Sequence, residues 1–202
     1  TDDELMWQEV FDDDDYKLVA ADVAGRTVLD IGAGVGAFAA RCLQLGAAVV
    51  VSVEPNPETC TAYRKVMAKE MLAGKAVLLE GAAWSKSGNG MLNLHSGGYR
   101  GSDSLITGGP DSLPCRLIDF GPLVSTIRPG ALKVDAESSE YELFREMPDL
   151  SSVEVAWVEF HETRTNQVRM TQMQNIMSRL GLVGLRPHRV KDGPGVVYSF
   201  KR

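Results

Sequence analysis

The stretch Val28-Leu29-Asp30-Ile31-Gly32-Ala33-Gly34-Val35-Gly36 decides the fold. It is an apolar run that leads directly into a turn with three glycines, and a helix-like pattern follows it. Glycine lets such a turn close tightly and lets a ligand approach the backbone. Free N–H groups at the start of the following helix favour a carboxylate or a phosphate. The stretch therefore predicts a buried strand, a ligand-binding turn and a helix, in that order.

Short β-branched runs alternate with amphipathic stretches from residue 26 onward, which is typical of a wound α/β sheet. Strands are predicted at Thr27–Ile31, Ala48–Val53, Ala76–Glu80, Ala131–Asp135 and Val153–Phe160. Helices are predicted at Gly36–Leu45, Pro57–Leu72, Glu140–Met147 and Gln167–Leu180. The end of the chain predicts a hairpin of Leu182–Val190 and Val196–Lys201. We thus expect a Rossmann-like α/β fold, with a mostly parallel twisted sheet, helices on both faces and a C-terminal antiparallel hairpin.

The chain is expected to hold one domain, residues 26–202, preceded by an acidic arm of residues 1–25. Within the domain, residues 85–122 are rich in Gly, Ser and Pro and contain strand-like pieces at Met91–His95 and Leu113–Ile118. Such an insertion on the substrate side often carries specificity in α/β enzymes, although a plain connecting loop explains it equally well.

The net charge of −6 on these 202 residues is concentrated at one end of the chain. Residues 1–15 carry eight acidic residues and no Lys or Arg, whereas the rest holds 19 acids and 21 bases. A block of like charge predicts a solvated arm, with a cation or partner site as the alternative. We also expect Asp12–Asp15 and Tyr16 to lead into the fold and to border the functional site. The balanced remainder has no cluster of Lys and Arg, which argues against a nucleic-acid partner.

Cys42, Cys60 and Cys115 are widely spaced, so neither a disulfide framework nor a zinc site is expected. A reducing, cytoplasmic compartment is therefore predicted. No window reaches the roughly 18 consecutive apolar residues of a membrane span, and the acidic start lacks the features of a signal peptide. Because Thr1 is not an initiator methionine, we expect the chain to be trimmed or excised from a longer one.

A second acidic residue, Glu54, follows Asp30 by 24 residues and ends the second predicted strand. An acid at this place grips the two hydroxyls of a ribose, so a cofactor that contains a nucleoside is predicted. The G-x-G-x-x-A pattern of residues 32–37 also satisfies the dinucleotide fingerprint, which keeps an NAD-dependent oxidoreductase as an alternative. Asp30 favours S-adenosylmethionine, because an acid at the strand tip can hold an ammonium group, which that cofactor carries and NAD lacks. The third glycine, Gly36, supports the same choice.

Several segments together resemble the class I S-adenosylmethionine-dependent methyltransferases, and within them the FkbM-type family. They are Val28–Gly36, Val53-Glu54-Pro55-Asn56-Pro57, Ala83-Trp84-Ser85 with Gly88, Leu132-Lys133-Val134-Asp135-Ala136-Glu137 and Val158-Glu159-Phe160-His161. The likeness spans residues 26–165, in order and at plausible spacings. Two positions depart from the family pattern: Ser138 stands where the family has glycine, and Ala136 where a larger aliphatic residue is common.

This resemblance implies a class I methyltransferase fold and a binding site for S-adenosylmethionine. The residues implied for the methionine part are Asp30, Gly32, Gly34 and Gly36, with Glu54 for the ribose and Asn56, Ala82 and Ala83 near the adenine.

Three polar residues, Asp135, Glu159 and His161, fall at the carboxyl ends of two neighbouring predicted strands, where ligands of wound sheets gather. They could serve as base and orienter for a hydroxyl acceptor, which is a poor nucleophile until it is deprotonated. They could equally hold a divalent cation. A merely hydrogen-bonded histidine at a strand end explains His161 as well as either.

The segment Asp135-Ala136-Glu137 bears on the class of acceptor, because amino-group methyltransferases often carry an N-P-P-Y turn at this place. The difference argues against a planar amine as the acceptor. The FkbM-type resemblance implies O-methylation of a hydroxyl on a sugar, a glycan or a small secondary metabolite, and allows the chain to be a module of a larger glycan-synthesis protein. A non-catalytic binding module with this fold remains the other alternative.

Overall fold

A computed structural model describes residues 2–94, 103–106, 111–146, 148–161, 171, 175–179, 181–184, 188–189 and 195–202.

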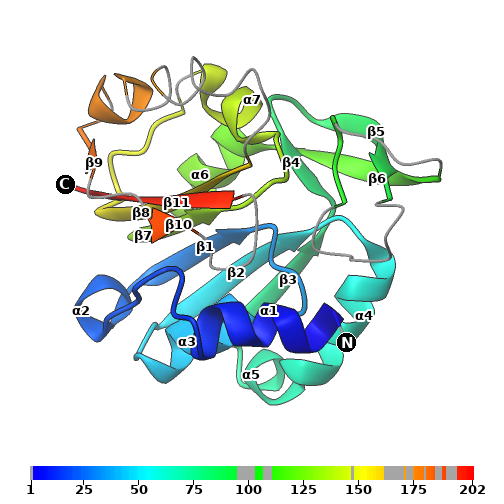
Figure 1. Cartoon of the computed structure of the whole chain (residues 1–202), viewed down its shortest axis with the longest axis horizontal. Coiled ribbons are helices and arrows are strands. Elements are labelled where there is room, and N and C mark those ends of the chain that lie inside the picture. The colour runs from blue at the N-terminus through cyan, green and yellow to red at the C-terminus, as the bar shows by residue number, and fades with distance from the viewer. Residues whose placement is uncertain are drawn as a thin grey trace.

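Within these residues, a mostly parallel sheet of eight strands forms the centre of the fold (Figure 1). The strand order is β10-β11-β8-β7-β1-β2-β3, and β9 also pairs with β11. The strands are β1 (Thr27–Ile31), β2 (Val49–Glu54), β3 (Ala76–Glu80), β7 (Ala131–Val134), β8 (Val155–His161), β9 (Val183–Gly184), β10 (His188–Arg189) and β11 (Gly195–Lys201). Strands β3, β2, β1, β7 and β8 run parallel, and β11 runs antiparallel to β8. The predicted Rossmann-like sheet and its closing antiparallel hairpin are confirmed.

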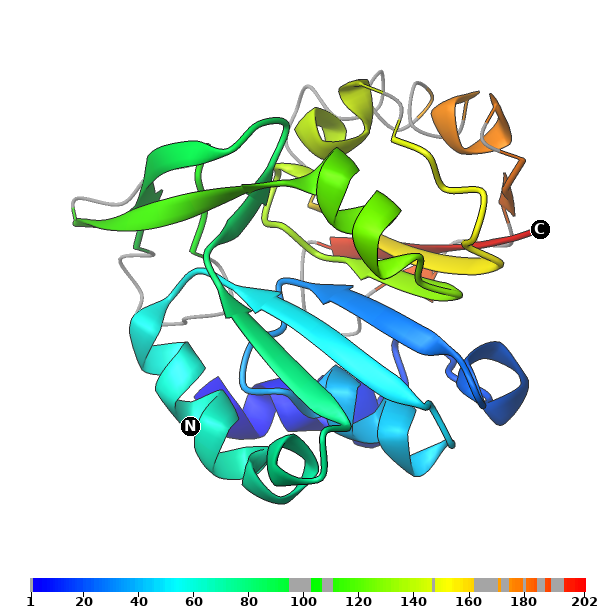
Figure 2. The ribbon, with the colours of Figure 1, turned by 180° about the vertical axis from the view of Figure 1, so that it is seen from behind.

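Helices cover both faces of this sheet (Figure 1 and, from behind, Figure 2). Helices α1, α3, α4 and α5 lie on one face, and α6 and α7 lie on the other. The helices are α1 (Asp2–Phe11), α2 (Ala20–Val23), α3 (Ala37–Gln44), α4 (Pro57–Val66), α5 (Ala68–Leu72), α6 (Phe120–Ile127) and α7 (Glu140–Arg145). The predicted helix Gln167–Leu180 is described only at residues 171 and 175–179, which are helical. In the described parts of the chain, no helix is both long and apolar enough to cross a membrane.

Both faces of β1 are buried, which explains why its sequence is a nearly continuous apolar run. Successive side chains of a strand point to opposite faces. Val28 accordingly packs in the cluster that contains Phe38 and Trp157, whereas Leu29 packs in the cluster on the other face with Phe120. The strand that leads into the glycine turn is therefore packed on both of its faces.

Two strands of the predicted insertion, residues 85–122, pair with the preceding β4 in a second sheet with the order β4-β6-β5. Its strands are β4 (Ala82–Trp84), β5 (Gly88–Asn93) and β6 (Ser112–Asp119). Helix α6 follows at once and was not predicted, because Gly121 and Pro122 resemble loop residues. A start signal is nevertheless present: the side chain of Asp119 accepts a hydrogen bond from Gly121 N at 3.2 Å, and proline is tolerated in a first helical turn.

The N-terminal segment packs onto the domain. Met6 and Val10 of α1 are buried four residues apart, on the face that contacts α3, and Tyr16 and Leu18 are buried after them. This packing differs from the solvated arm that the charge run predicted, because apolar side chains at helical spacing dock on the domain, and one of the acids, Asp15, is buried with them. The boundary at residue 25 stays a prediction.

Candidate cofactor and catalytic site

The glycine turn after β1 is packed closely against neighbouring elements at two of its positions. Gly32 has φ of +74°, and a Cβ atom there would collide with the carbonyl oxygen of Asp135. Gly34 has φ of +53°, and a Cβ there would lie 2.9 Å from the sulfur of Met6. Gly36 is the N-cap residue of α3. The turn thus lies against the end of β7 on one side and under α1 on the other.

Glu54 joins this turn to the start of α4. Its Oε2 accepts a hydrogen bond from Gly34 N at 3.0 Å, and its Oε1 accepts one from Asn56 N at 2.9 Å. Burial raises the pKa of Glu54 to about 7, although both backbone hydrogen bonds oppose the rise. A carboxylate oxygen has two lone pairs, so each oxygen can accept a further hydrogen bond. Two hydroxyl donors would match this remaining capacity of the ionised side chain.

Asn56 is a buried helix cap that also binds the insertion. Its Oδ1 accepts hydrogen bonds from Glu58 N at 2.9 Å and Thr59 N at 3.4 Å. Its Nδ2 donates to Asp103 Oδ2 at 2.6 Å. The next residue, Ser104, donates through Oγ to the carbonyl oxygen of Glu137 at 2.5 Å. Residues 103–106 therefore lie across the edge where β2 and β7 end.

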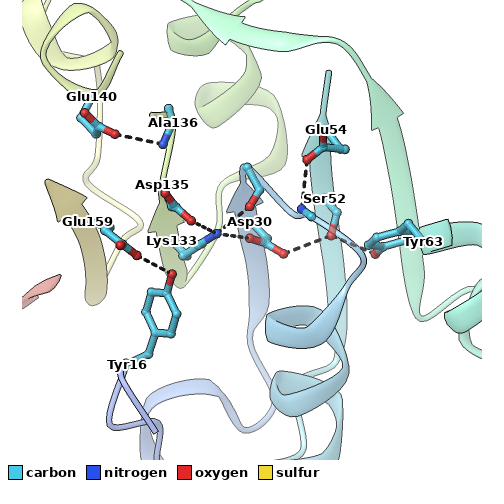
Figure 3. Close-up of polar contacts among 12 residues, drawn as sticks. Tyr16, Asp30, Ser52, Glu54, Tyr63, Lys133, Asp135, Ala136, Glu140 and Glu159 are labelled. Carbon is cyan, nitrogen blue, oxygen red and sulfur yellow. Dashed lines mark hydrogen bonds and ion pairs between the residues drawn. The ribbon is translucent and has the colours of Figure 1, made fainter. Parts of the chain in front are cut away.

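Lys133 is the centre of a buried charged cluster below that edge (Figure 3). Its Nζ donates to Gly32 O at 2.6 Å and to Asp135 Oδ2 at 3.0 Å, and lies 3.7 Å from Asp30 Oδ1. Burial alone would lower the pKa of Lys133, but the charges of Asp135 and Asp30 outweigh it and hold the pKa above its ordinary value. The lysine is therefore charged throughout the physiological range.

Asp30 is fully buried beside this lysine. Ser52 Oγ donates to its Oδ2 at 3.4 Å. Burial raises the pKa of Asp30, and the charge of Lys133 opposes the rise. The sequence pointed to a ligand ammonium group as the partner of Asp30, whereas the structure supplies Lys133. Contact of Asp30 with a cofactor stays a prediction.

Tyr16 brings the N-terminal segment to the same edge. Its hydroxyl donates to Glu159 Oε2 at 3.0 Å, and its ring meets Phe38 edge-on at 5.1 Å between centroids. Burial, followed by the charges of Glu159 and Asp135, raises the pKa of Tyr16 well above its ordinary value. The phenol therefore stays protonated and remains a donor.

The predicted catalytic residues come from adjacent strands, as expected. Asp135 follows β7 and Glu159 lies in β8, and the two strands pair through Val134 and Val158. His161 is the last residue of β8, but its side chain lies outside the described residues. In the described part of the chain, no group of three or more His, Cys, Asp or Glu is placed to hold a metal ion. Ala82 and Ala83, predicted near an adenine, are buried in β4.

The loop after β7 explains one departure from the family pattern. Ser138, where the family has glycine, has φ of +77°, a left-handed conformation that favours glycine. Glu140, at the start of α7, accepts hydrogen bonds at Oε1 from Ala136 N at 3.0 Å and Ser138 N at 3.2 Å. This carboxylate holds the loop in place without glycine.

Two interactions of the site were not predicted from the sequence. Lys133 belongs to the Leu132–Glu137 segment that resembles the family, but no partner was predicted for it, and the pairing of β1 with β7 brings it against Asp30 and Gly32. The spacing of Lys133 and Asp135, two residues apart, places both side chains on the same face of the strand. Tyr16 was expected near the site, but its partner Glu159 is 143 residues away in the sequence.

No family model and no curated protein matches this chain. Solved structures do match. A magnesium protoporphyrin IX methyltransferase from Synechocystis PCC 6803 with bound S-adenosylmethionine is 15% identical over 96% of this chain and 79% of its own, with a TM-score of 0.58. A putative RNA methyltransferase from Pyrococcus horikoshii is 14% identical over 90% of this chain and 77% of its own, with a TM-score of 0.51.

Methyltransferase FkbM from Methylobacillus flagellatus KT is 15% identical over 87% of this chain, with a TM-score of 0.56. The match covers only 43% of the FkbM chain. At these identities the likeness concerns the fold, and the acceptors named for these neighbours differ. The sheet order, the glycine turn and the three neighbours agree on one conclusion: this chain has the Rossmann-like fold of the class I S-adenosylmethionine-dependent methyltransferases.

Proposed function

We propose that this protein is a methyltransferase that binds S-adenosylmethionine and transfers its methyl group to a hydroxyl of a sugar, a glycan or a small secondary metabolite. The observation that carries the proposal is the placement of Glu54, whose two carboxylate oxygens face the glycine turn and the start of α4. A ribose offers two adjacent hydroxyl donors to such a carboxylate.

The residues present fit the cofactor. Gly32, Gly34 and Gly36 all have positive φ, which lets the turn close tightly, and the turn is followed directly by the N-terminus of α3. In this assignment the turn holds the methionine part, Glu54 the ribose, and Asn56 borders the adenine together with Ala82 and Ala83. When bound, the cofactor supplies an electrophilic methyl group on a sulfonium, so the protein has to orient the acceptor and exclude water.

Asp135 and Glu159 are proposed to act on the acceptor. The hydroxyl proton of the acceptor would pass to one of these carboxylates as the acceptor oxygen is methylated, with Asp135 as the first candidate. Tyr16 donates to Glu159 and Lys133 donates to Asp135, so each carboxylate has a donor that fixes one oxygen.

A divalent cation held by Asp135, Glu159 and His161 is the second way to activate a hydroxyl. Treatment with EDTA distinguishes the cation from the carboxylate base. Activity that survives EDTA and depends on His161 supports the base. Activity that is lost with EDTA and restored by Mg²⁺ or Mn²⁺ supports the cation.

The hydroxyl acceptor is favoured by the residues after β7, because Asp135-Ala136-Glu137 replaces the N-P-P-Y turn of many amino-group methyltransferases. The FkbM-type resemblance supports a sugar or natural-product hydroxyl. We also propose a reducing, cytoplasmic setting, in keeping with free thiols at Cys42, Cys60 and Cys115.

A thermal-shift panel of S-adenosylmethionine, S-adenosylhomocysteine and NAD tests the proposal, because a ligand raises the unfolding temperature according to its occupancy. We expect both sulfur compounds to stabilise the protein. Stabilisation by NAD alone would support an oxidoreductase instead, and no stabilisation by any of the three would support a non-catalytic module.

A further inference from the structure

Lys133 is a buried charged residue at a place in the sheet where the core needs only an apolar side chain. Its side chain is 4% exposed, yet the neighbours of Lys133 in the central strand β7, Leu132 and Val134, are apolar. Its ammonium group also lies 5.7 Å from the ring centroid of Tyr16 and 5.9 Å from that of Phe38. A buried ion pair is weak evidence for stability, because an apolar residue of similar volume often serves as well. The charged group therefore calls for another explanation.

The ammonium group of Lys133 donates hydrogen bonds to two parts of the proposed site, the glycine turn and the proposed base. Gly32 O belongs to the glycine turn proposed to hold the methionine part of the cofactor, and it accepts at 2.6 Å. Asp135 Oδ2 belongs to the proposed base, and it accepts at 3.0 Å. The turn and the carboxylate are also in steric contact, because the backbone of Asp135 fills the space where Gly32 would carry a side chain. A single ammonium group thus joins the turn to the carboxylate.

We propose that Lys133 is a positioning residue for methyl transfer, which fixes the glycine turn and the carboxylate of Asp135 relative to each other so that donor and acceptor are held in line. The inference rests on the proposed function and assigns the lysine a role within it. Hydrogen bonds with a charged partner are shorter and stronger than neutral ones, which suits a link between two loops.

The role of Lys133 can be tested without a known acceptor by comparing the affinities of the protein for two ligands. In the proposed site S-adenosylmethionine would contact both the turn and Glu54, whereas adenosine has the ribose and lacks the methionine part. Lys133→Met should weaken binding of S-adenosylmethionine about tenfold or more, since a charge-assisted contact behind the turn is lost. Adenosine affinity should stay unchanged, and Lys133→Arg should recover part of the loss. Isothermal titration calorimetry measures all of these affinities.

Lys201→Met is the matched control. Lys201 also forms an ion pair from the same sheet, with Asp22 at 2.7 Å, but it lies opposite Val155 at the start of β8, at the other end of the strands. The control should bind both ligands like the wild type. If Lys133→Met does not fold, Lys133→Gln, which removes the charge but keeps a hydrogen-bond donor, serves in its place.

The outcomes separate the two proposals. If Lys133→Met loses affinity equally for both ligands, or loses affinity for neither, the positioning role is overturned while the proposed function stays intact. Failure of the wild-type protein to bind S-adenosylmethionine would overturn the proposed function and the role that rests on it.

Discussion

The backbone N–H of Gly34 donates a hydrogen bond of 3.0 Å to Oε2 of Glu54 and so joins the turn after β1 to the end of β2. The contact links the two sequence features from which the cofactor was inferred, the glycine motif and the acid 24 residues after Asp30. It places them in one site, because β1 and β2 pair in parallel and end at the same edge of the sheet.

Glu54 predicts a pH dependence of stability. Its folded-state pKa of about 7 is raised from 4.5 by burial, so the folded protein retains a proton that the unfolded chain has released. The contribution of the protonated side chain is therefore fully present below about pH 4.5 and is lost as the pH rises through about 7. The wild type should lose up to about 3 kcal/mol relative to Glu54→Gln between pH 5 and pH 8. Urea unfolding at both values measures the difference.

Glu80→Gln is the control for this experiment. Glu80 ends the neighbouring strand in register with Glu54, but its side chain is 53% exposed and pairs with Arg64. The difference in unfolding free energy between Glu80→Gln and the wild type should not change with pH in the same way. A constant difference between the wild type and Glu54→Gln would contradict the buried, proton-retaining carboxyl.

Gly32→Ala tests the close approach of the turn to β7. A Cβ atom would collide with the backbone of Asp135, which cannot move without disturbing the end of β7. Gly25 has a similar φ, +71° against +74°, and open space around its missing Cβ. Gly25→Ala should therefore cost only about 1 kcal/mol for its conformation, whereas Gly32→Ala should cost about 3 kcal/mol or more. Equal losses in chemical denaturation would refute the steric argument.

Tyr16→Phe tests the contact of the N-terminal segment with Glu159, one of the two carboxylates proposed to act on the acceptor. Loss of its hydroxyl leaves Glu159 without that donor and should cost about 1–2 kcal/mol. Tyr63→Phe removes a comparable buried hydroxyl, which donates to Ser52 Oγ at 2.9 Å. We expect similar stability losses from both, but a fall in kcat with unchanged cofactor affinity only from Tyr16→Phe. Equal kcat for the two variants would reduce Tyr16 to a structural contact.

The sequence was most informative where local pattern and tertiary environment agree. Strands β1 and β3 begin and end at the predicted residues, because the glycine turn ends one and Gly81 follows the other. The long helix predicted at Pro57–Leu72 is divided at Met67 into α4 and α5. Helix propensity does not reveal such an interruption.

The parts of the site that were missed depend on contacts across the fold. The role of Lys133 requires the pairing of β1 with β7, whose residues are about a hundred positions apart in the chain. The charge run suggested a solvated segment because local composition says nothing of Met6 packing over Gly34. Likewise, the reach of Asp103 to Asn56 follows from the second sheet and not from any motif.

The central claim is tested most directly by calorimetric titration of the wild type, Glu54→Gln and Glu80→Gln with S-adenosylmethionine at pH values on both sides of 7. Ribose hydroxyls donate to the ionised carboxylate, so wild-type affinity should rise with pH through about 7, the pKa of Glu54. Glu54→Gln should bind about tenfold or more weakly and show no such rise, and Glu80→Gln should behave like the wild type. Binding of NAD in place of S-adenosylmethionine, or unchanged affinity in Glu54→Gln, would contradict the account.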